Sequence, residues 1–413
     1  MFANYQKTHA LSSQKYLQIP KAMSKQSSQE LNNSNVTTAV PSPNPPHQVG
    51  LTPGEALQRY KDELTMFEKT ELMQFEQIYT VGSFRRHALQ EIADAEGYYR
   101  VRVGEQLGYR FLVSEIVDKG AFGQVVRGVD LKDGGREVAL KISRNKKFDV
   151  DNAHVEFRIL QTLKQHDPAD SHGVVRVIDS FPFRKHVVLV FELLGTNLYK
   201  HLKTEQARFS QGQLRRLAGQ MLQALAFIKE VGVVHCDLKP ENILFTDEKK
   251  ETIKIIDFGS SCFSYKSGFT YVQSRYYRAP EIVLGLPYNQ AADMWSFGCI
   301  MAELRTGRPL FPALDENELL EFFVMMIGLP SNDMIDKCKK RAKFFDKDGK
   351  LQRSRQSRLK NQAKKSYPLR RAIDHDPTAE GDFMDFLERC LELDPDRRLT
   401  PEQALAHPWI KLK

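Results

Sequence analysis

The spacing of apolar residues changes several times along this chain. Residues 1–50 are rich in Gln, Ser and Asn and, near their end, in Pro, and they hold too few large apolar side chains to offset the entropy of ordering the chain. We therefore expect a disordered tail. Beyond it, helical spacing gives way to the short apolar runs of strands and then returns. This pattern predicts an N-terminal extension, a small β-rich lobe and a larger, mostly helical lobe, at 51–110, 111–194 and 195–413.

The extension opens with the signature of a helix start. In "LTPGEALQRYKDELTMFE", Thr52 is a candidate N-cap, Pro53 occupies the first helical position, and Glu55 completes a capping box. Four apolar residues at helical spacing predict that this helix has an apolar face, which must dock on another part of the protein: Leu57, Tyr60, Leu64 and Phe67.

The two lobes are expected to contain different elements. The first should hold five strands, FLVSEIV, GQVVRGV, EVALKIS, VVRVIDS and HVVLVFEL. A helix between the third and fourth strands presents a face formed by Val155, Ile159 and Leu163. The second lobe shows a helical stripe before residue 232: Leu214, Leu217, Met221, Leu225 and Ile228. Its later helices are expected at 291–305, at 383–393 and after the capping pair Thr400 and Pro401.

Composition limits the compartment and the kind of site. The chain is 41% hydrophobic, but it holds no run of about 18–20 apolar residues and no secretory signal. Its five cysteines are scattered without C-x-x-C spacing, which argues against a zinc site and a disulfide framework. We expect a soluble protein without membrane association, in the cytoplasm and/or the nucleus.

The formal charge of +8 is concentrated in one segment. Residues 337–371 hold fifteen Lys or Arg against two acids, so the rest of the chain is slightly negative. This basic insert is interpreted as a solvated surface, with a nuclear-import or acidic-partner patch at 337–343 as the alternative. Aromatic residues do not interleave with its charges, so binding to nucleic acid is disfavoured.

The segment "GVVHCDLKPENILF" has two readings. Cys236 could be a thiol nucleophile, but the adjacent His235 points to the opposite face of an extended segment and cannot easily take its proton. The favoured reading is a phosphoryl-transfer loop, in which Asp237 and Asn242 converge on a phosphate-metal site, together with Lys239.

Other motifs supply the remaining parts of such a site. Gly120 and Gly123 in "KGAFGQVV" let backbone N–H groups approach phosphates, although most glycine turns bind nothing. Lys141 follows in V-A-L-K-I, with Glu156 as its expected partner. Asp257 ends the strand in "IKIIDFGSS". Asp257 would hold Mg²⁺ at the phosphates, Asn242 a second Mg²⁺, and Asp237 would accept the proton of the attacking hydroxyl.

The ordered motifs, continuing with "RAPE", "DMWSFG" and "DPDRRLT", resemble the eukaryotic protein kinase family over about residues 111–412. Within it, "HCDLKPENIL", "IDFGSSC" and "YVQSRYYRAPEIVLG" resemble the dual-specificity tyrosine-regulated kinases of the CMGC group. The extension is similar to the N-terminal homology region of their class 2 members. The resemblance implies an α+β, two-lobe kinase fold and a monomer that uses ATP and Mg²⁺ to phosphorylate Ser/Thr of protein substrates and its own Tyr.

The resemblance also implies where the nucleotide lies. Phe191 falls at the position that controls the depth of the adenine pocket, and residues 192–194 form the hinge. The implied nucleotide-binding residues are Val117, Gly120, Ala121, Phe122, Gly123, Val125, Ala139, Lys141, Phe191, Glu192, Leu194, Leu244 and Ile256. Glu281 and Arg398 should pair and brace the helical lobe.

Activation and substrate choice follow from the same resemblance. Cys236 replaces the Arg that in most regulated kinases pairs with activation-loop phosphate, so the loop must be held otherwise. The family motif Y-x-Y reads "FTY" here, which makes Tyr271 the site of autophosphorylation and Arg275 and Arg278 its cations. Glu241 matches a position that faces basic residues upstream of the target, and the family favours Ser/Thr with a nearby Arg and a following Pro.

One position departs from the kinase pattern. Where the loop usually has its first glycine, this chain has Asp118. A carboxylate there would repel a triphosphate by about 1 kcal/mol if solvated. We expect it to point to solvent instead. Asp118 is the only sequence feature in favour of the alternative function, a pseudokinase scaffold with weakened nucleotide binding.

Overall fold

The computed structural model describes residues 49–82, 84, 86, 92–121, 123–204, 209–246, 249–264, 271–352, 369–373 and 381–412. The expected tail lies almost wholly outside the described residues, as does the middle of the basic insert. Contacts divide the chain into two units. Unit 1 comprises the residues up to His154 together with Ile178–Leu193, and unit 2 comprises Val155–Val177 and Leu194–Lys413.

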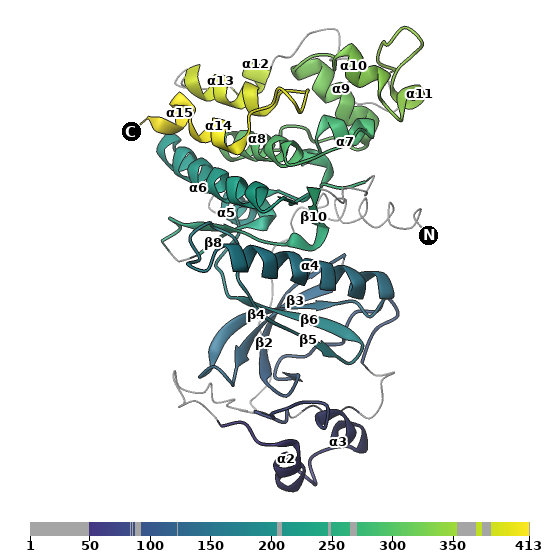
Figure 1. The fold of residues 1–413 in the computed structure, drawn as a ribbon, viewed down its shortest axis with the longest axis vertical. Coiled ribbons are helices and arrows are strands. Elements are labelled where there is room, and N and C mark those ends of the chain that lie inside the picture. Colours follow the sequence, from purple (N-terminus) through teal and green to yellow (C-terminus); the bar gives the residue numbers. More distant parts are fainter. Residues whose placement is uncertain are drawn as a thin grey trace, which may run out of the picture. The chain divides into compact units, whose positions relative to one another are not determined.

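Unit 1 is built on one six-stranded sheet in the order β1-β2-β3-β4-β6-β5, drawn in blue and teal in Figure 1. The strands are β1 (Gln106–Leu107), β2 (Phe111–Gly120), β3 (Gly123–Asp130), β4 (Arg136–Ser143), β5 (Val177–Phe183) and β6 (His186–Glu192). All five expected strands are confirmed, and the short edge strand β1 is additional. Apolar residues alternate along β3 and β4, which places one face of the sheet in a core with Val126, Val138, Leu140 and Ile142.

The extension forms two short helices, α2 (Pro53–Arg59) and α3 (Met66–Leu72), so the apolar spacing through Leu64 and Phe67 does not belong to one helix. The capping box of Thr52 and Glu55 is confirmed. A second capping box, made by Thr65 and Glu68, starts α3. The expected apolar face does dock: residues of both helices form a core with a tyrosine that precedes β2, and its members are Ala56, Leu64, Leu72, Ile78 and Tyr109.

A buried polar network lies beside this core. We call it the extension network; its members are Glu71, Arg86, Tyr99, Glu105, Tyr109 and Arg184. The Nε atom of Arg184 donates to Oε1 of Glu71 at 2.9 Å, with side chains 1% and 9% exposed. Tyr109 donates to the same carboxylate at 2.8 Å. Arg86 and Glu105 form a second pair at 2.8 Å. Each of these buried charges therefore has an opposite charge in contact.

Unit 2 is mainly helical (Figure 1). Its helices, with α4 divided between the units, are α4 (Lys147–His166), α5 (Leu198–Thr204), α6 (Gln211–Glu230), α7 (Pro280–Leu284), α8 (Ala291–Thr306), α9 (Glu316–Met326), α10 (Asn332–Asp336), α11 (Arg341–Phe344), α12 (Leu369–Ile373), α13 (Gly381–Cys390), α14 (Pro401–Leu405) and α15 (Pro408–Lys411). The α6 stripe is buried throughout, as expected. Val155 of α4 is 43% exposed, so the predicted apolar face of that helix is wrong at this residue.

Helix α8 is buried on all sides, from Ala292 to Leu304. It contacts α6 and α13, and α6 in turn contacts α14 and α15. The capping box of Thr400 at the start of α14 is confirmed. Among the described residues, no helix is both long and apolar enough to cross a membrane.

Candidate active site

Two small two-stranded sheets in unit 2 bring the predicted catalytic residues together. Strand β7 (Val233–Val234) pairs with β10 (Cys262–Phe263), and β8 (Ile243–Phe245) pairs with β9 (Ile253–Ile255). The loop between β7 and β8 carries residues 235–242, and the loop between β9 and β10 carries Asp257. The two loops are joined directly, because the N–H of Ile256 donates to the carbonyl of Asn242 at 2.9 Å.

Asp293 of α8 anchors the first of these loops. Its fully buried carboxylate accepts the backbone N–H groups of His235 at 2.7 Å and Cys236 at 3.0 Å. Burial raises the pKa of Asp293, against the opposing effect of these hydrogen bonds. The backbone of Cys236 has φ 63°, a left-handed conformation that a non-glycine residue adopts only when its surroundings impose it.

The ring of His235 is held by the backbone. Its Nδ1 accepts the N–H of Asp237 at 3.2 Å, so the proton lies on Nε2, which donates to the carbonyl of Ile256 at 3.0 Å. The ring packs edge-on against Phe258, with centroids 4.8 Å apart. His235 therefore braces the two loops and does not act as a base for a thiol.

Cys236 is a buried bystander. Its side chain is 0% exposed, and a hydrogen bond with Cys262, together with burial, raises the pKa of its thiol well above the usual value. A nucleophilic cysteine needs a lowered pKa and an accessible sulfur. The structure therefore agrees with the rejection of a thiol nucleophile at this position.

Asp237 is the most engaged side chain of the loop. Its Oδ1 accepts the Oγ–H of Ser274 at 2.8 Å, and its Oδ2 accepts the ammonium of Lys239 at 2.7 Å. The carboxylate stays 14% exposed. Burial acts to lower the pKa of Lys239, but the charges of Asp237 and Asp257 outweigh it and raise that pKa. A charged lysine thus lies under the influence of both carboxylates, beside an acceptor that solvent can reach.

The predicted metal ligands fit magnesium chemistry. The carboxamide nitrogen of Asn242 donates to the carbonyl of Asp237 at 2.9 Å, which leaves its oxygen as the atom for a metal. Asp257 has φ 64° and ψ 71° and precedes the short helix η3 (Phe258–Ser260). One carboxylate and one amide oxygen, completed by phosphate and water oxygens, suit Mg²⁺.

Gln273, which sequence reasoning missed, connects the segment after Tyr271 to the catalytic loop. Its N–H donates to the carbonyl of Cys236 at 3.0 Å. Its side-chain nitrogen donates to Ala292 and Ser296 of α8, both at 2.9 Å. Its side-chain oxygen accepts the N–H of Ala279 at 2.7 Å. Its carbonyl also accepts the guanidinium of Arg278 at 2.8 Å, so Gln273 ties the segment after Tyr271 to the catalytic loop, to α8 and to Arg278.

Two acids with raised pKa values lie near one another, the half-buried Glu241 of the catalytic loop and the buried Glu303 of α8. In Glu241, burial raises the pKa, and among the described residues its Oε2 has no hydrogen-bond partner. Glu303 of α8 accepts the hydroxyl of Tyr277 at 2.6 Å. Burial raises the pKa of Glu303 to about 7, and the nearby charge of Glu241 adds to the effect. The sequence did not predict a role for Glu303, because the only local signal there is that this residue follows an apolar run.

Tyr271 lies against its two predicted arginines. The guanidinium carbon of Arg278 is 3.8 Å from the centroid of the Tyr271 ring. Burial acts to raise the pKa of Tyr271, but its interactions with Arg278 and Arg275 prevail and lower that pKa. Phe269 lies outside the described residues.

The 337–343 patch of the basic insert is ion-paired within unit 2. Glu316 of α9 contacts Lys343 at 2.8 Å, Lys340 at 3.1 Å and Arg278 at 3.4 Å. Lys337 pairs with Asp333 at 2.7 Å. Much of this positive charge is therefore already balanced by neighbouring acids, which favours the solvated-surface interpretation. The expected brace is also confirmed: Glu281 and Arg398 pair at 2.8 Å with both side chains fully buried.

In unit 1, several predicted nucleotide residues share one face of the sheet. Val125 lies directly opposite Lys141, and Ala139 lies opposite Phe191. Residues directly opposite in adjacent strands point to the same side, which here is the side away from the buried Val126 and Leu140. Lys141 belongs to unit 1 and Glu156 to unit 2, so their pairing stays a prediction.

The glycine turn between β2 and β3 shows a structural reason for one of its glycines. A Cβ on Gly123 would lie 2.2 Å from the carbonyl oxygen of Ile142, so β3 could not approach β4 with any other residue there. Gly120 meets no such neighbour. Asp118 is exposed, as expected, and its carboxylate accepts the N–H of Lys119 at 2.8 Å. Phe122 lies outside the described residues.

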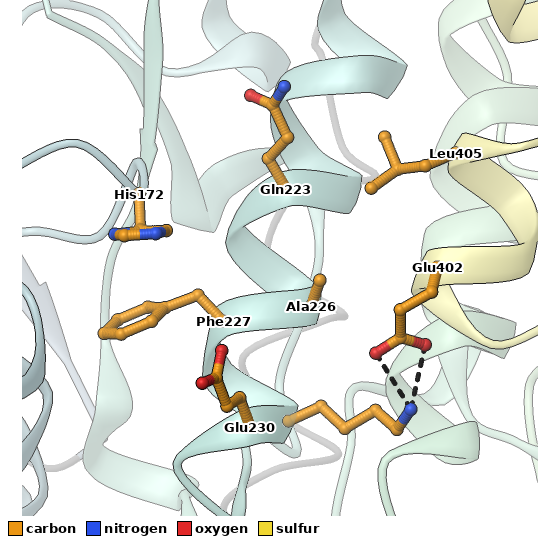
Figure 2. Close-up of a pocket in the computed structure, with 8 residues that line it drawn as sticks. His172, Gln223, Ala226, Phe227, Glu230, Glu402 and Leu405 are labelled. Atoms are coloured by element: carbon orange, nitrogen blue, oxygen red, sulfur yellow. Dashed lines mark hydrogen bonds and ion pairs between the residues drawn. The ribbon is translucent and has the colours of Figure 1, made fainter.

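An open pocket of about 490 Å³ lies elsewhere in unit 2 (Figure 2). Lys229 of α6 forms an ion pair of 2.8 Å with Glu402 of α14, which is labelled in Figure 2. The lining residues are His172, Gln223, Ala226, Phe227, Lys229, Glu230, Glu402 and Leu405. This pocket contains none of the predicted site residues.

Comparison with known proteins gives consistent matches. Residues 111–410 match the protein kinase domain family. The chain is 41% identical over 391 residues to dual specificity tyrosine-phosphorylation-regulated kinase 3 of Homo sapiens, covering 88% of this chain and 66% of that protein. It is also 39% identical over 373 residues to dual specificity tyrosine-phosphorylation-regulated kinase 4 of Homo sapiens, covering 88% of this chain and 71% of that protein. It spans about two thirds of the length of these relatives.

Proposed function

Because the chain belongs to the protein kinase family and, within it, to the dual specificity tyrosine-phosphorylation-regulated kinases, we propose that it transfers the terminal phosphoryl group of ATP to Ser and Thr of other proteins and to its own Tyr271. The observation that carries this proposal is the cluster of Asp237, Lys239 and Asn242, joined to the segment of Asp257 by a backbone hydrogen bond.

Each side chain of the cluster has a step to perform. The partly exposed carboxylate of Asp237 accepts the proton of the incoming hydroxyl. Hydrogen bonds from Ser274 and Lys239 fix the orientation of this carboxylate. The ammonium of Lys239 offsets negative charge that develops on the transferred group. One Mg²⁺ held by Asp257 and a second held by Asn242 would neutralise the phosphates of the bound nucleotide.

Nucleotide binding is assigned to the sheet face that carries Val125, Ala139, Lys141 and Phe191, with residues 192–194 as the hinge. In unit 2, Leu244 of β8 and Ile256 are proposed to contact the base. Lys141 would bind the phosphates and pair with Glu156.

Autophosphorylation of Tyr271 is supported by its surroundings. Arg278 and Arg275 lower the pKa of Tyr271, and the Arg278 guanidinium lies 3.8 Å from the ring centroid. A phosphate on Tyr271 would accept charge-assisted hydrogen bonds from both guanidinium groups. Intact-mass measurement and peptide mapping of the purified protein should find phosphate on Tyr271. Tyr271→Phe should lower activity about tenfold or more, and a fully active protein with bare Tyr271 would contradict the proposal.

Substrate choice is proposed to depend on Glu241 and Glu303. Among the described residues, neither carboxylate forms an ion pair, and an arginine upstream of the target residue would supply the missing cation. The preference for a following Pro rests on the family resemblance.

The cysteines at the described positions are buried and unbridged, which supports the proposed cytoplasmic and/or nuclear location.

The decisive experiment is transfer of radiolabelled phosphate from ATP with Mg²⁺ to a peptide library and to the protein itself. Asp257→Asn is the control, because it removes the proposed metal ligand while keeping the side-chain shape. Label on both acceptors with the parent, and on neither with the variant, is the expected result. Weak nucleotide binding by a folded parent protein, without any transfer, would favour the pseudokinase scaffold instead.

A further inference from the structure

The extension reaches the glycine turn of the sheet through a short turn of its own, residues 94–98. The N–H of Asp94 donates to the carbonyl of Tyr98 at 2.9 Å, and the Asp94 carboxylate accepts the N–H of Tyr98 at 2.8 Å. The hydroxyl of Tyr98 then donates to the carbonyl of Gly120 at 2.8 Å. A hydrogen bond thus joins two segments that lie 22 residues apart.

A second pair of contacts supports this connection. The ammonium of Lys119 lies 3.1 Å from the Asp94 carboxylate and 4.0 Å from the centroid of the Tyr98 ring. Lys119 is the residue between Asp118 and Gly120, so the 94–98 turn touches two consecutive residues of the glycine turn. Both segments belong to unit 1.

The 94–98 turn is itself fixed to the sheet. The carbonyl of Gly97 accepts the N–H of Asn145, just beyond β4, at 2.9 Å. The next residue, Tyr99, offers its carbonyl to the side chain of Gln124 in β3 at 2.6 Å. Tyr98 is therefore held on both sides, by one neighbour bonded to the segment after β4 and one bonded to β3, and it can serve as a rigid support for the glycine turn.

We propose that Tyr98 is a positioning residue for ATP, which pre-orders the glycine turn by holding the carbonyl of Gly120. This inference rests on the proposed function, because it assumes that the turn covers the phosphates. A carbonyl oxygen bound to Tyr98 does not swing toward a phosphate, which would repel it. A turn that is already ordered loses less entropy when the nucleotide binds.

The hydroxyl and the ion pair should respond differently to salt. Lys119 and Asp94 are 53% and 26% exposed, so water and salt weaken their attraction. The hydrogen bond of Tyr98 has no such dependence on salt. The two contributions can therefore be separated by ionic strength.

The test uses Tyr98→Phe in the full chain, which removes one oxygen and keeps the ring. We expect KM for ATP to rise about fivefold while kcat changes less than about twofold. Amide hydrogen exchange at residues 118–124 of the nucleotide-free protein should become faster. Asp94→Asn should raise KM by about twofold at low salt and leave it unchanged in about 0.5 M salt.

Tyr60→Phe is the matched control. Tyr60 lies at the C-terminal end of α2 in the same extension, so this change also removes a tyrosine hydroxyl but does not affect the glycine turn. It should leave KM and exchange unchanged. Unchanged KM and exchange in Tyr98→Phe would overturn the proposal, as would an equal change in the control. If the parent transfers no phosphate, the proposed function fails, while exchange and equilibrium binding of MgATP still decide the role of Tyr98.

Discussion

The extension network and the catalytic loop both bury charged groups, but they satisfy them differently. In the extension network, Arg184 and Arg86 each contact a glutamate, and the side chains of both pairs are at most 9% exposed. In the catalytic loop, Asp237 stays 14% exposed and Lys239 22% exposed. Glu241 has a carboxylate oxygen with no hydrogen-bond partner among the described residues.

This difference separates stability from chemistry. A closed set of paired charges is costly to break and has no group left for a ligand, so it fixes the extension on the sheet. The catalytic loop instead keeps charged groups without a full set of partners, and a substrate can supply the missing partner. This arrangement costs some stability. The same residue types thus serve two purposes, and solvent access and unfilled hydrogen bonds distinguish them.

The largest effect is expected from Asp237→Asn. The amide cannot accept the hydroxyl proton, so kcat should fall by about a thousandfold or more. The bonds from Ser274 and Asn242 to this residue can persist in part, and the melting temperature should therefore change little. A steady-state assay and thermal unfolding measure the two quantities, and a variant keeping a tenth of parental activity would contradict the assigned role.

Breaking the extension network should lower the free energy of unfolding and leave kcat almost unchanged. Arg184→Met leaves Glu71 buried without its cation, and the free energy of unfolding should fall by about 3–5 kcal/mol. Urea unfolding gives this value, and kcat of the folded protein should stay within about threefold. The control is Arg127→Met, which opens an exposed pair with Glu137 and should cost about 1 kcal/mol or less. Equal losses in both variants would remove the distinction.

Gln273→Ala tests the connection between the two loops. It leaves the N–H of Ala279 without its acceptor and removes the side-chain bonds to α8, and kcat should fall about tenfold because the segment that is bonded to Cys236 is no longer fixed on α8. Gln220→Ala is a matched control: Gln220 also bridges backbone groups, those of Ile253 and Glu251, away from the catalytic loop. It should lower stability similarly and leave kcat unchanged. A similar loss of kcat in both variants would show that Gln273 acts through general stability.

The smallest effect concerns pH. Burial raises the pKa of Glu303 to about 7, with Glu241, Lys203 and Tyr277 as its other neighbours. The folded protein then holds a proton that the unfolded chain releases near pH 4.5, so this group lowers stability as pH rises to about 7. Ionised Glu303 attracts arginine, so KM for an Arg-containing peptide should fall about threefold from pH 6 to 8. Glu303→Gln should abolish this trend, and a flat parental profile would argue against the role.

The sequence predicts what depends on local order and misses what depends on distant contacts. Thr52 and Thr400 were identified as caps because a capping box spans only four residues. The equivalent signal of Thr65 and Glu68 was also present and would have divided the extension into two helices. Motif residues such as Asp237 were found because their chemistry fixes their spacing. Gln273 and Glu303 were missed, since their roles come from packing against residues far away in the chain.

The ion pair of Arg184 and Glu71 also limits when the extension can fold during translation. The two residues are 113 positions apart, and Glu71 is made first. At about 5–20 residues per second, Glu71 waits roughly 6–23 s on the ribosome before its partner is translated. During that interval, helices α2 and α3 have no finished sheet on which to settle. The nascent chain is therefore most open to proteases and chaperones until the hairpin of β5 and β6 emerges.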